Sequence, residues 1–138
     1  MSSHVGVEAL VLEIRNQEVS RVSFDYGFTI LTDEGVEVRL ERPFSYRDAA
    51  GGHRLIDPEQ RPSNSAPLLD LLGAGISSMT ANDEGGDLTI DFVDGCSLHC
   101  PVDDSFEAWA VSAPDGGKWI SMPGGGVARW AAVGEPTS

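Results

Sequence analysis

The sequence has few basic residues, and one long stretch of it has none. Its nine basic residues are one lysine, Lys118, and eight arginines, against 22 Asp and Glu and a net charge of −13. No lysine or arginine occurs between residues 62 and 117. Because an acidic surface repels phosphate backbones and anionic lipids, we expect the protein to bind neither nucleic acid nor a membrane surface.

The negative charge is concentrated in the middle of the chain. Residues 1–61 contain 11 acids and 7 bases (−4), residues 62–117 contain 10 acids and no base (−10), and residues 118–138 contain 1 acid and 2 bases (+1). Such a block favours a basic protein partner. A solvated surface that keeps the protein soluble explains the block equally well.

Long apolar segments are also missing. No apolar run approaches the roughly 18 residues of a membrane span, and the first residues, MSSHVGVEAL, lack the basic and apolar regions of a signal peptide. We therefore expect a cytoplasmic protein. A chain of 138 residues and 14.7 kDa fits one domain with its own core. We predict a single β-rich domain over residues 1–130 and a disordered tail over residues 131–138.

Cysteine is scarce: the only two, Cys96 and Cys100, lie in the segment CSLHC. In a strand, residues four apart are roughly 13 Å from each other, whereas a disulfide needs Cα atoms within about 7 Å. Cys96, Leu98 and Cys100 would share the buried face of such a strand, with Ser97 and His99 pointing outward. We predict two buried thiols, with a metal site or an unusual turn as alternatives.

Familiar catalytic motifs are absent. The sequence has no Gly-x-Ser-x-Gly, no His-Glu-x-x-His and no dinucleotide fingerprint, and its three histidines (His4, His53 and His99) are isolated. The neighbouring carboxylates Asp103 and Asp104 suit a solvated turn better than an acid–base pair. The pattern favours a non-enzymatic protein, and we predict no catalytic residue, no metal site and no cofactor.

Alternating apolar and polar residues predict strands along most of the chain. Val36, Val38 and Leu40 alternate with charged residues, which is typical of an antiparallel sheet with one buried face. We predict one short helix over residues 65–73, with Pro67 in its first turn and Gly73 at its end. Residues 43–66 show no predicted element, which indicates a functional loop, local disorder or an unrecognised element.

Two parts of the sequence resemble each other. The first part consists of Val19-x-x-Val22, a second strand, Asp33-Glu34-Gly35 and a strand ending at Pro43. The second part has the same order: Ile76-x-x-Met79, a second strand, Asp94-Gly95 and a strand ending at Pro101. This similarity indicates an internal duplication, although an ordinary meander would give a similar pattern. We predict a mainly β (α+β) fold: an antiparallel sheet of two meander-like strand units, one short helix and a C-terminal hairpin.

The C-terminal hairpin, residues 106–130, contains all three tryptophans: Trp109, Trp119 and Trp130. Pro114-Asp115-Gly116-Gly117 forms its turn, and Pro123-Gly124-Gly125-Gly126 is a second bend. The glycine run lacks the Lys-Ser/Thr of a phosphate-binding loop, so a structural bend is favoured over an anion cradle. We expect the three indoles to fill the core, with an aromatic binding surface as the alternative.

Four segments carry a resemblance: Asp94-Gly95 to Pro101, Phe106-Glu107-Ala108-Trp109, Asp115-Gly116, and Pro123-Gly124-Gly125-Gly126-Val127-Ala128-x-Trp130. In these segments the sequence resembles a family of short actinobacterial proteins. The resemblance covers about residues 11–130. Its most specific parts are Glu-Ala-Trp and Pro-Gly-Gly-Gly. The family is a domain of unknown function, so the resemblance implies no catalytic residue.

The acidic block leads to a functional hypothesis. We predict an interaction protein whose acidic surface receives a basic protein, such as an immunity protein that neutralises a toxin. The alternative is a small-ligand binding module or an enzyme that uses the Trp-bearing hairpin and residues 43–66. A homodimer formed by pairing of strand edges is a third hypothesis. The candidate binding residues are Asp103, Asp104, Glu107, Trp109 and Trp119.

Overall fold

The computed structural model describes residues 10–60 and 62–130. These residues form twelve strands and one 3₁₀ helix: β1 (Leu10–Ile14), β2 (Gln17–Phe24), β3 (Phe28–Thr32), β4 (Glu37–Leu40), β5 (Phe44–Arg47), β6 (His53–Ile56), η1 (Pro62–Leu71), β7 (Gly75–Asn82), β8 (Leu88–Phe92), β9 (Ser97–Cys100), β10 (Trp109–Ser112), β11 (Lys118–Ser121) and β12 (Val127–Trp130). The predicted tail, 131–138, lies outside the described residues. The prediction of a mainly β chain with very little helix is confirmed.

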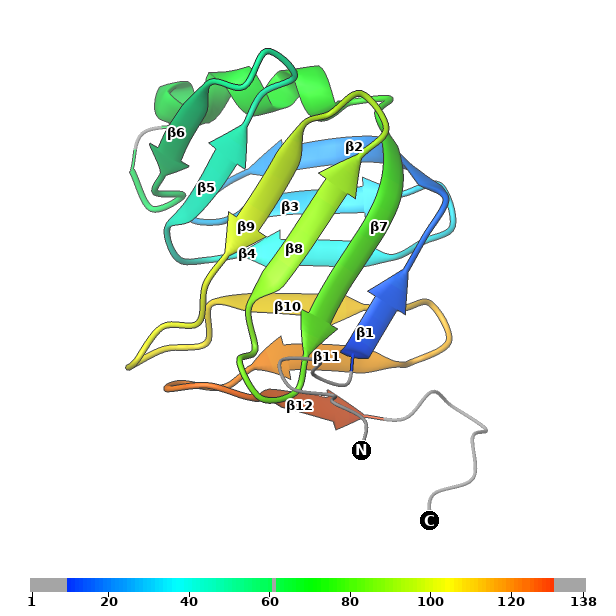
Figure 1. Ribbon diagram of the computed structural model, residues 1–138, viewed down its shortest axis with the longest axis vertical. Helices are drawn as coiled ribbons and strands as arrows, with labels where there is room; N and C mark the ends of the chain where they lie inside the picture. Colours follow the sequence, from blue (N-terminus) through cyan, green and yellow to red (C-terminus); the bar gives the residue numbers. More distant parts are fainter. Residues whose placement is uncertain (1–9, 61, 131–138) are drawn as a thin grey trace, which may run out of the picture.

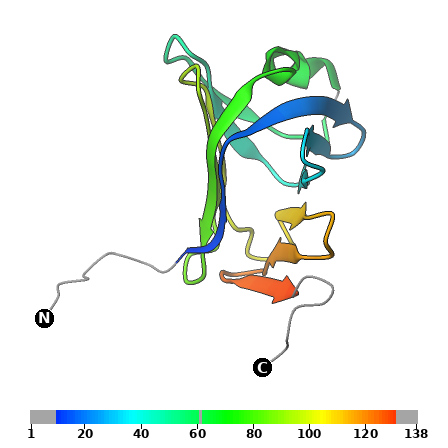
Figure 2. The same cartoon turned by 90° about the vertical axis from the view of Figure 1, so that its right-hand side faces the viewer.

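The strands form one continuous antiparallel sheet that folds into two facing layers. Its order is β12-β11-β10-β4-β3-β2-β7-β8-β9-β5-β6, and β1 also pairs with β7. Strand β2 meets β7 only through the pairs Gln17–Ile76 and Glu18–Gly75, where the sheet passes from one layer to the other. The strands of the two layers cross each other steeply (Figure 1), and the layers are separate when seen from the side (Figure 2).

The sheet order is the same on both sides of the β2–β7 pair. Outward from β2 lie β3, β4, β10 and β11, and outward from β7 lie β8, β9, β5 and β6; β12 adds one further strand beyond β11. Each unit is a three-stranded meander followed by a hairpin. The hairpin pairs with the other meander: β5 follows β4 but pairs with β9, and β10 follows β9 but pairs with β4. Both predicted strand units are present, and they exchange their closing hairpins.

Local details repeat between the two units as well. The register shifts between Val19 and Arg21 in β2 and between Ile76 and Ser78 in β7. The serine inside each bulge donates its hydroxyl across the hairpin: Ser20 to Leu31 O at 3.1 Å, and Ser77 to Asp91 O at 3.0 Å. These matched irregularities support the predicted duplication beyond what an ordinary meander would produce.

The core lies between the two layers and follows the alternation of the strands. Phe28 and Phe44 stack there with ring centroids 5.9 Å apart, and Trp109 is also fully buried. In β9 and the turn before it, Cys96, Leu98 and Cys100 are buried, while Ser97 and His99 face outward. Both cysteines are free, so the prediction of two buried thiols is confirmed.

Of the three alternatives for residues 43–66, the structure agrees with an unrecognised element. These residues contain the β5–β6 hairpin, whose turn is closed by Asp48: its Oδ1 accepts hydrogen bonds from Ala50 N at 3.0 Å and Gly52 N at 2.8 Å. Only Phe44, Tyr46 and Ile56 of these two strands are buried. Two four-residue strands, one of them largely exposed, are too short to show a clear alternation.

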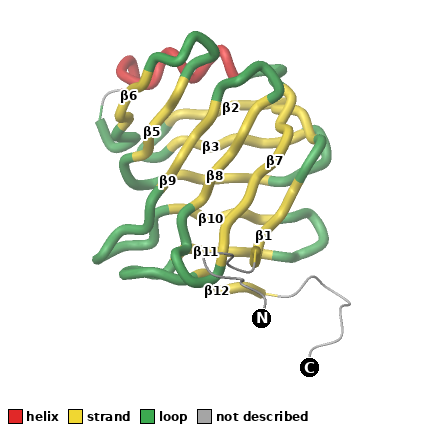
Figure 3. Tube along the Cα trace, viewed as in Figure 1, coloured by secondary structure: helices red, strands yellow, loops and turns green. Residues whose placement is uncertain are grey.

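The predicted helix exists, but it starts earlier and is wound more tightly. It is a 3₁₀ helix from Pro62 to Leu71 instead of an α-helix over residues 65–73, and it lies across one end of the molecule (Figure 3). Side chains three apart align in a 3₁₀ helix. Accordingly Leu68 and Leu71 are buried, whereas Leu69 and Leu72 are exposed.

The expectation that all three indoles fill the core is wrong. Only Trp109 of the three tryptophans is fully buried; Trp119 is half-buried and Trp130 is 52% exposed, because β11 and β12 form the outer edge of their layer.

Candidate binding groove

Three loops meet at one end of the molecule: residues 83–87 between β7 and β8, 101–108 between β9 and β10, and 122–126 between β11 and β12 (Figure 1). Gly124 N donates to Asp103 O at 2.8 Å. A Cβ atom on Gly86 would lie only 2.8 Å from Gly126 O. The glycine run is therefore a turn whose backbone packs directly on two other loops, which agrees with the predicted bend.

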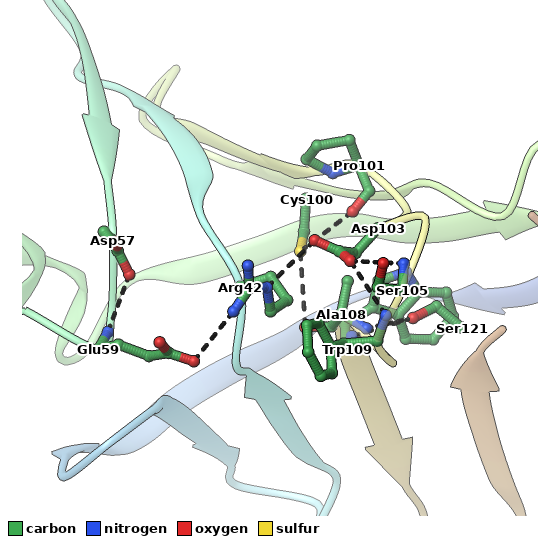
Figure 4. Close-up of polar contacts among 11 residues, drawn as sticks. Arg42, Asp57, Glu59, Cys100, Pro101, Asp103, Ser105, Ala108, Trp109 and Ser121 are labelled. Carbon is green, nitrogen blue, oxygen red and sulfur yellow. Dashed lines mark hydrogen bonds and ion pairs between the residues drawn. The ribbon is translucent and has the colours of Figure 1, made fainter. Parts of the chain in front are cut away.

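Buried hydrogen bonds fix the position of the segment that leads into β10. The buried hydroxyl of Ser121 accepts hydrogen bonds from Ala108 N at 2.8 Å and Trp109 N at 3.1 Å (Figure 4). The indole Nε1 of Trp109 donates to Gly86 O at 2.9 Å. With Ala108 and Trp109 anchored, the two preceding residues, Phe106 and Glu107, stay at the surface.

An open groove of about 590 Å³ lies beside this anchored segment. Four separate parts of the chain line it: the β4–β5 connection, the turn after β6, the β9–β10 loop and the β11–β12 turn. Its lining residues are Glu41, Arg42, Glu59, Ser105, Phe106, Glu107 and Pro123. The ring of Phe106 is 58% exposed there.

Arg42 connects the parts of the groove. Its Nε donates to Asp103 Oδ2 at 3.1 Å and its Nη1 to Glu59 Oε1 at 3.1 Å (Figure 4). Its Cζ lies 5.0 Å from the centroid of the Phe106 ring, within the range of a cation–π contact. The hydrogen bond to Asp103 raises the pKa of Arg42, so the guanidinium remains charged.

Asp103 organises the loop around it. Its Oδ1 accepts hydrogen bonds from Ser105 N at 2.8 Å and Phe106 N at 3.0 Å, while its Oδ2 faces Arg42. The hydrogen bond from Ser105 N is the main cause that lowers the pKa of this carboxyl group below its ordinary value. The hydrogen bond from Phe106 N and the guanidinium of Arg42 lower this pKa further. Asp103 is therefore ionised at neutral pH and fixes the side of the groove that carries Phe106.

The groove and the loops beside it are strongly acidic. The three loops contain no lysine or arginine, and they carry Asp83, Glu84, Asp87, Asp103, Asp104 and Glu107. Within the described residues, no hydrogen bond or ion pair engages the side chains of Asp83, Glu84, Asp104 or Glu107. We call this region, with the groove residues Glu41 and Glu59, the acidic end.

Residues 10–131 match the model of a family of unknown function, DUF6188. The chain belongs to this family. The match covers both strand units, the groove and the whole acidic end of this DUF6188 member. A search of curated proteins and a search of solved structures found no match.

The DUF6188 fold brings only some of the predicted binding residues together. Asp103 and Glu107 lie in or beside the groove, and Asp104 is exposed between them in sequence. Trp109 lies in the core. Trp119 is half-buried in β11; its Nε1 donates to Val11 O at 2.9 Å, and Arg129 Cζ lies 5.5 Å from its ring.

Sequence analysis missed Arg42, Glu41, Glu59 and Phe106 as groove residues. Arg42 and Asp103 are 61 positions apart, in the two different strand units. No local spacing relates them, because they meet only when the hairpins exchange between the units. The predicted duplication did not give the order of the strands, so it offered no signal for this meeting.

A second polar cluster lies on the outer face of the sheet. His99 Nε2 is 3.2 Å from Asp87 Oδ2, and its Nδ1 is 3.3 Å from Thr89 Oγ1. The order acid, imidazole, hydroxyl is that of a catalytic triad, but such a triad also requires oxyanion donors around a bound substrate. Both side chains of the ion pair are nearly half exposed on a β-sheet face, outside the groove.

Among the described residues, no group of three or more His, Cys, Asp or Glu is placed to hold a metal ion. No helix of the described part of the chain has the length and apolar character needed to cross a membrane.

Proposed function

We propose that this DUF6188 protein is a non-enzymatic interaction protein that presents its acidic end to a basic protein, in the manner of an immunity protein that neutralises a toxin. The observation that carries the proposal is the gathering of carboxylates from two loops, 83–87 and 101–108, and from two further segments at this end of the molecule. Among the described residues that line this groove, Arg42 is the one basic residue.

Electrostatics and surface chemistry both support a protein partner. Like charges gathered on one face attract a partner of opposite sign and speed its association. Asp83, Glu84 and Asp104 have no partner within the described residues, so their charges are available to another molecule. The exposed ring of Phe106 adds an aromatic anchor of the kind that contributes strongly to protein interfaces.

The small-ligand alternative has less support. Trp109 lies in the core and β5 and β6 pair as a hairpin, so of the parts named for that alternative only Glu59, Phe106, Glu107 and Pro123 line the groove. The groove is of ligand size but is open and charged, whereas small-molecule sites are mostly apolar and enclosed.

Two further proposals concern origin and location. We propose that the protein is cytoplasmic, which suits two cysteines that remain free. We also propose an actinobacterial origin for the family, in keeping with eight arginines against one lysine in this chain.

An affinity capture from the lysate of the source organism tests the main proposal. The baits are the wild-type protein, the acidic-end variant D83N/E84Q/D104N, and the control variant E18Q/E34Q/E37Q, which removes the same charge from β2, the β3–β4 turn and β4. None of these six side chains makes a hydrogen bond or ion pair within the described residues.

We expect the wild type and the control to retain the same basic protein at low salt, and the acidic-end variant to lose it. Raising the salt to about 0.5 M, where the screening length is only a few Å, should release the partner. Capture of no basic protein, or equal capture by both triple variants, would contradict the proposal.

A further inference from the structure

Building on the proposed function, we infer that the groove binds one lysine or arginine side chain of the partner, with its aliphatic stem against Phe106 and Pro123 and its cationic head on Glu107. This ring and proline line the groove together with Glu41, Arg42, Glu59, Ser105 and Glu107. Long basic side chains bury their methylene groups on apolar surface while the charged head stays on a polar partner.

Glu107 is the acceptor that the fold leaves available. Glu59 is already bonded to Arg42 at 3.1 Å, and Glu41 lies 3.6 Å from Arg39 Nε. Glu107 is exposed and makes no hydrogen bond or ion pair within the described residues. The backbone position of Glu107 is nevertheless defined, because the amides of the next two residues, Ala108 and Trp109, donate to the hydroxyl of Ser121.

The chain itself supplies an example of the expected contact. Arg42 holds its guanidinium 5.0 Å from the Phe106 ring while two carboxylates, Glu59 and Asp103, neutralise it. A second cation beside Glu107 would meet the same combination of aromatic ring and carboxylate. With three glutamates against Arg42 in the lining, the groove keeps a negative charge that attracts this cation.

Titration of the ¹⁵N-labelled full-length protein with the peptide acetyl-Gly-Arg-Gly-amide, followed by NMR, tests the inference. We expect the amide signals of Ser105, Phe106 and Glu107 to shift most. The same peptide with citrulline, which is neutral but of similar shape, should cause no comparable shifts. An anionic groove would bind the first peptide more strongly at low salt.

The variants E107Q and F106A are expected to weaken peptide binding about fivefold each, and the control E34Q to leave it unchanged. The dispersion of the amide signals shows whether each variant is folded, and E107Q changes only a surface charge. Equal shifts over all acidic loops, or unchanged affinity in folded E107Q, would overturn the inference.

The two proposals fail in different ways. If the wild-type bait captures no basic protein but the arginine peptide maps to the groove, the proposed function is wrong and the groove inference stands. If capture depends on Asp83, Glu84 and Asp104 while E107Q and F106A capture normally and the peptide does not bind the groove, the groove inference is wrong and the proposed function stands.

Discussion

Arg42 donates from Nε to Asp103 Oδ2 at 3.1 Å and thereby ties the end of the first meander to the loop that follows the second meander. Both side chains are about three-quarters covered, and the same carboxylate also accepts two backbone amides of its own loop. One ion pair thus fixes both the groove and the junction between the two units.

The first prediction concerns the pH dependence of this contact. Because the pKa of Asp103 is lowered in the folded state, its ionised form stabilises the fold at neutral pH. That contribution is lost as the pH falls from about 4, the ordinary value, through the lower folded pKa. Urea unfolding of the wild type and D103N should therefore show a stability difference that is largest at neutral pH and shrinks in acid.

D104N is the matched control, since it removes a neighbouring charge that has no partner within the described residues. It should behave like the wild type through the acidic range. A stability difference for D103N that stays constant from neutral pH through the acid range would show that its charge has no part in stability.

The second prediction concerns the close contact of two loops. In G86A, the new Cβ would lie 2.8 Å from Gly126 O and 2.9 Å from Val102 Cγ1, at a residue whose φ is +84°. We expect a loss of about 3 kcal/mol in the free energy of unfolding, from backbone strain and overpacking together. Chemical denaturation measures this loss.

Gly73 offers a control with the same backbone conformation. Its φ is also +84°, but nothing lies within 4 Å of the position of its missing Cβ. G73A should therefore cost only the strain, about 1 kcal/mol. Equal losses in the two variants would mean that the loop contact does not constrain the fold.

The third prediction concerns Ser121, which is fully buried and accepts two backbone amides. S121A leaves both N–H groups without a partner in the core, and we expect a loss of about 2 kcal/mol in the free energy of unfolding. S45A, which removes a single long bond of 3.5 Å to His99 O at the surface, should change stability by less than about 0.5 kcal/mol. A neutral effect of S121A would rule out its anchoring role.

The fourth prediction concerns thiol reactivity. Burial raises the pKa of Cys100 to about 12 and also raises that of Cys96, so little thiolate forms near neutral pH. With 1% and 6% of these residues exposed, neither should react quickly with Ellman's reagent in the native protein. Both should react at once in denaturant, and fast labelling without denaturant would contradict their burial.

Sequence reasoning succeeded where a pattern is local. The alternation in residues 36–40 and 96–100 correctly predicted which side chains face the core, because neighbouring side chains of a strand point to opposite faces. It failed for the β5–β6 hairpin, whose strands are short and lie near the sheet edge. At the groove, it named Glu107 and the neighbouring Asp103 but neither Arg42, the cationic partner of Asp103, nor the exposed ring of Phe106.

By itself, the sequence determined the strand content, the burial of both thiols, the two similar strand units and the excess of negative charge. Only the tertiary structure decided that each unit closes with the other's hairpin and that Arg42, Phe106 and Glu107 meet in one groove. The physical reason is that strand patterns depend on residues two positions apart. The pairing of β4 with β10 and of β9 with β5 depends on the free energy of all long-range contacts together.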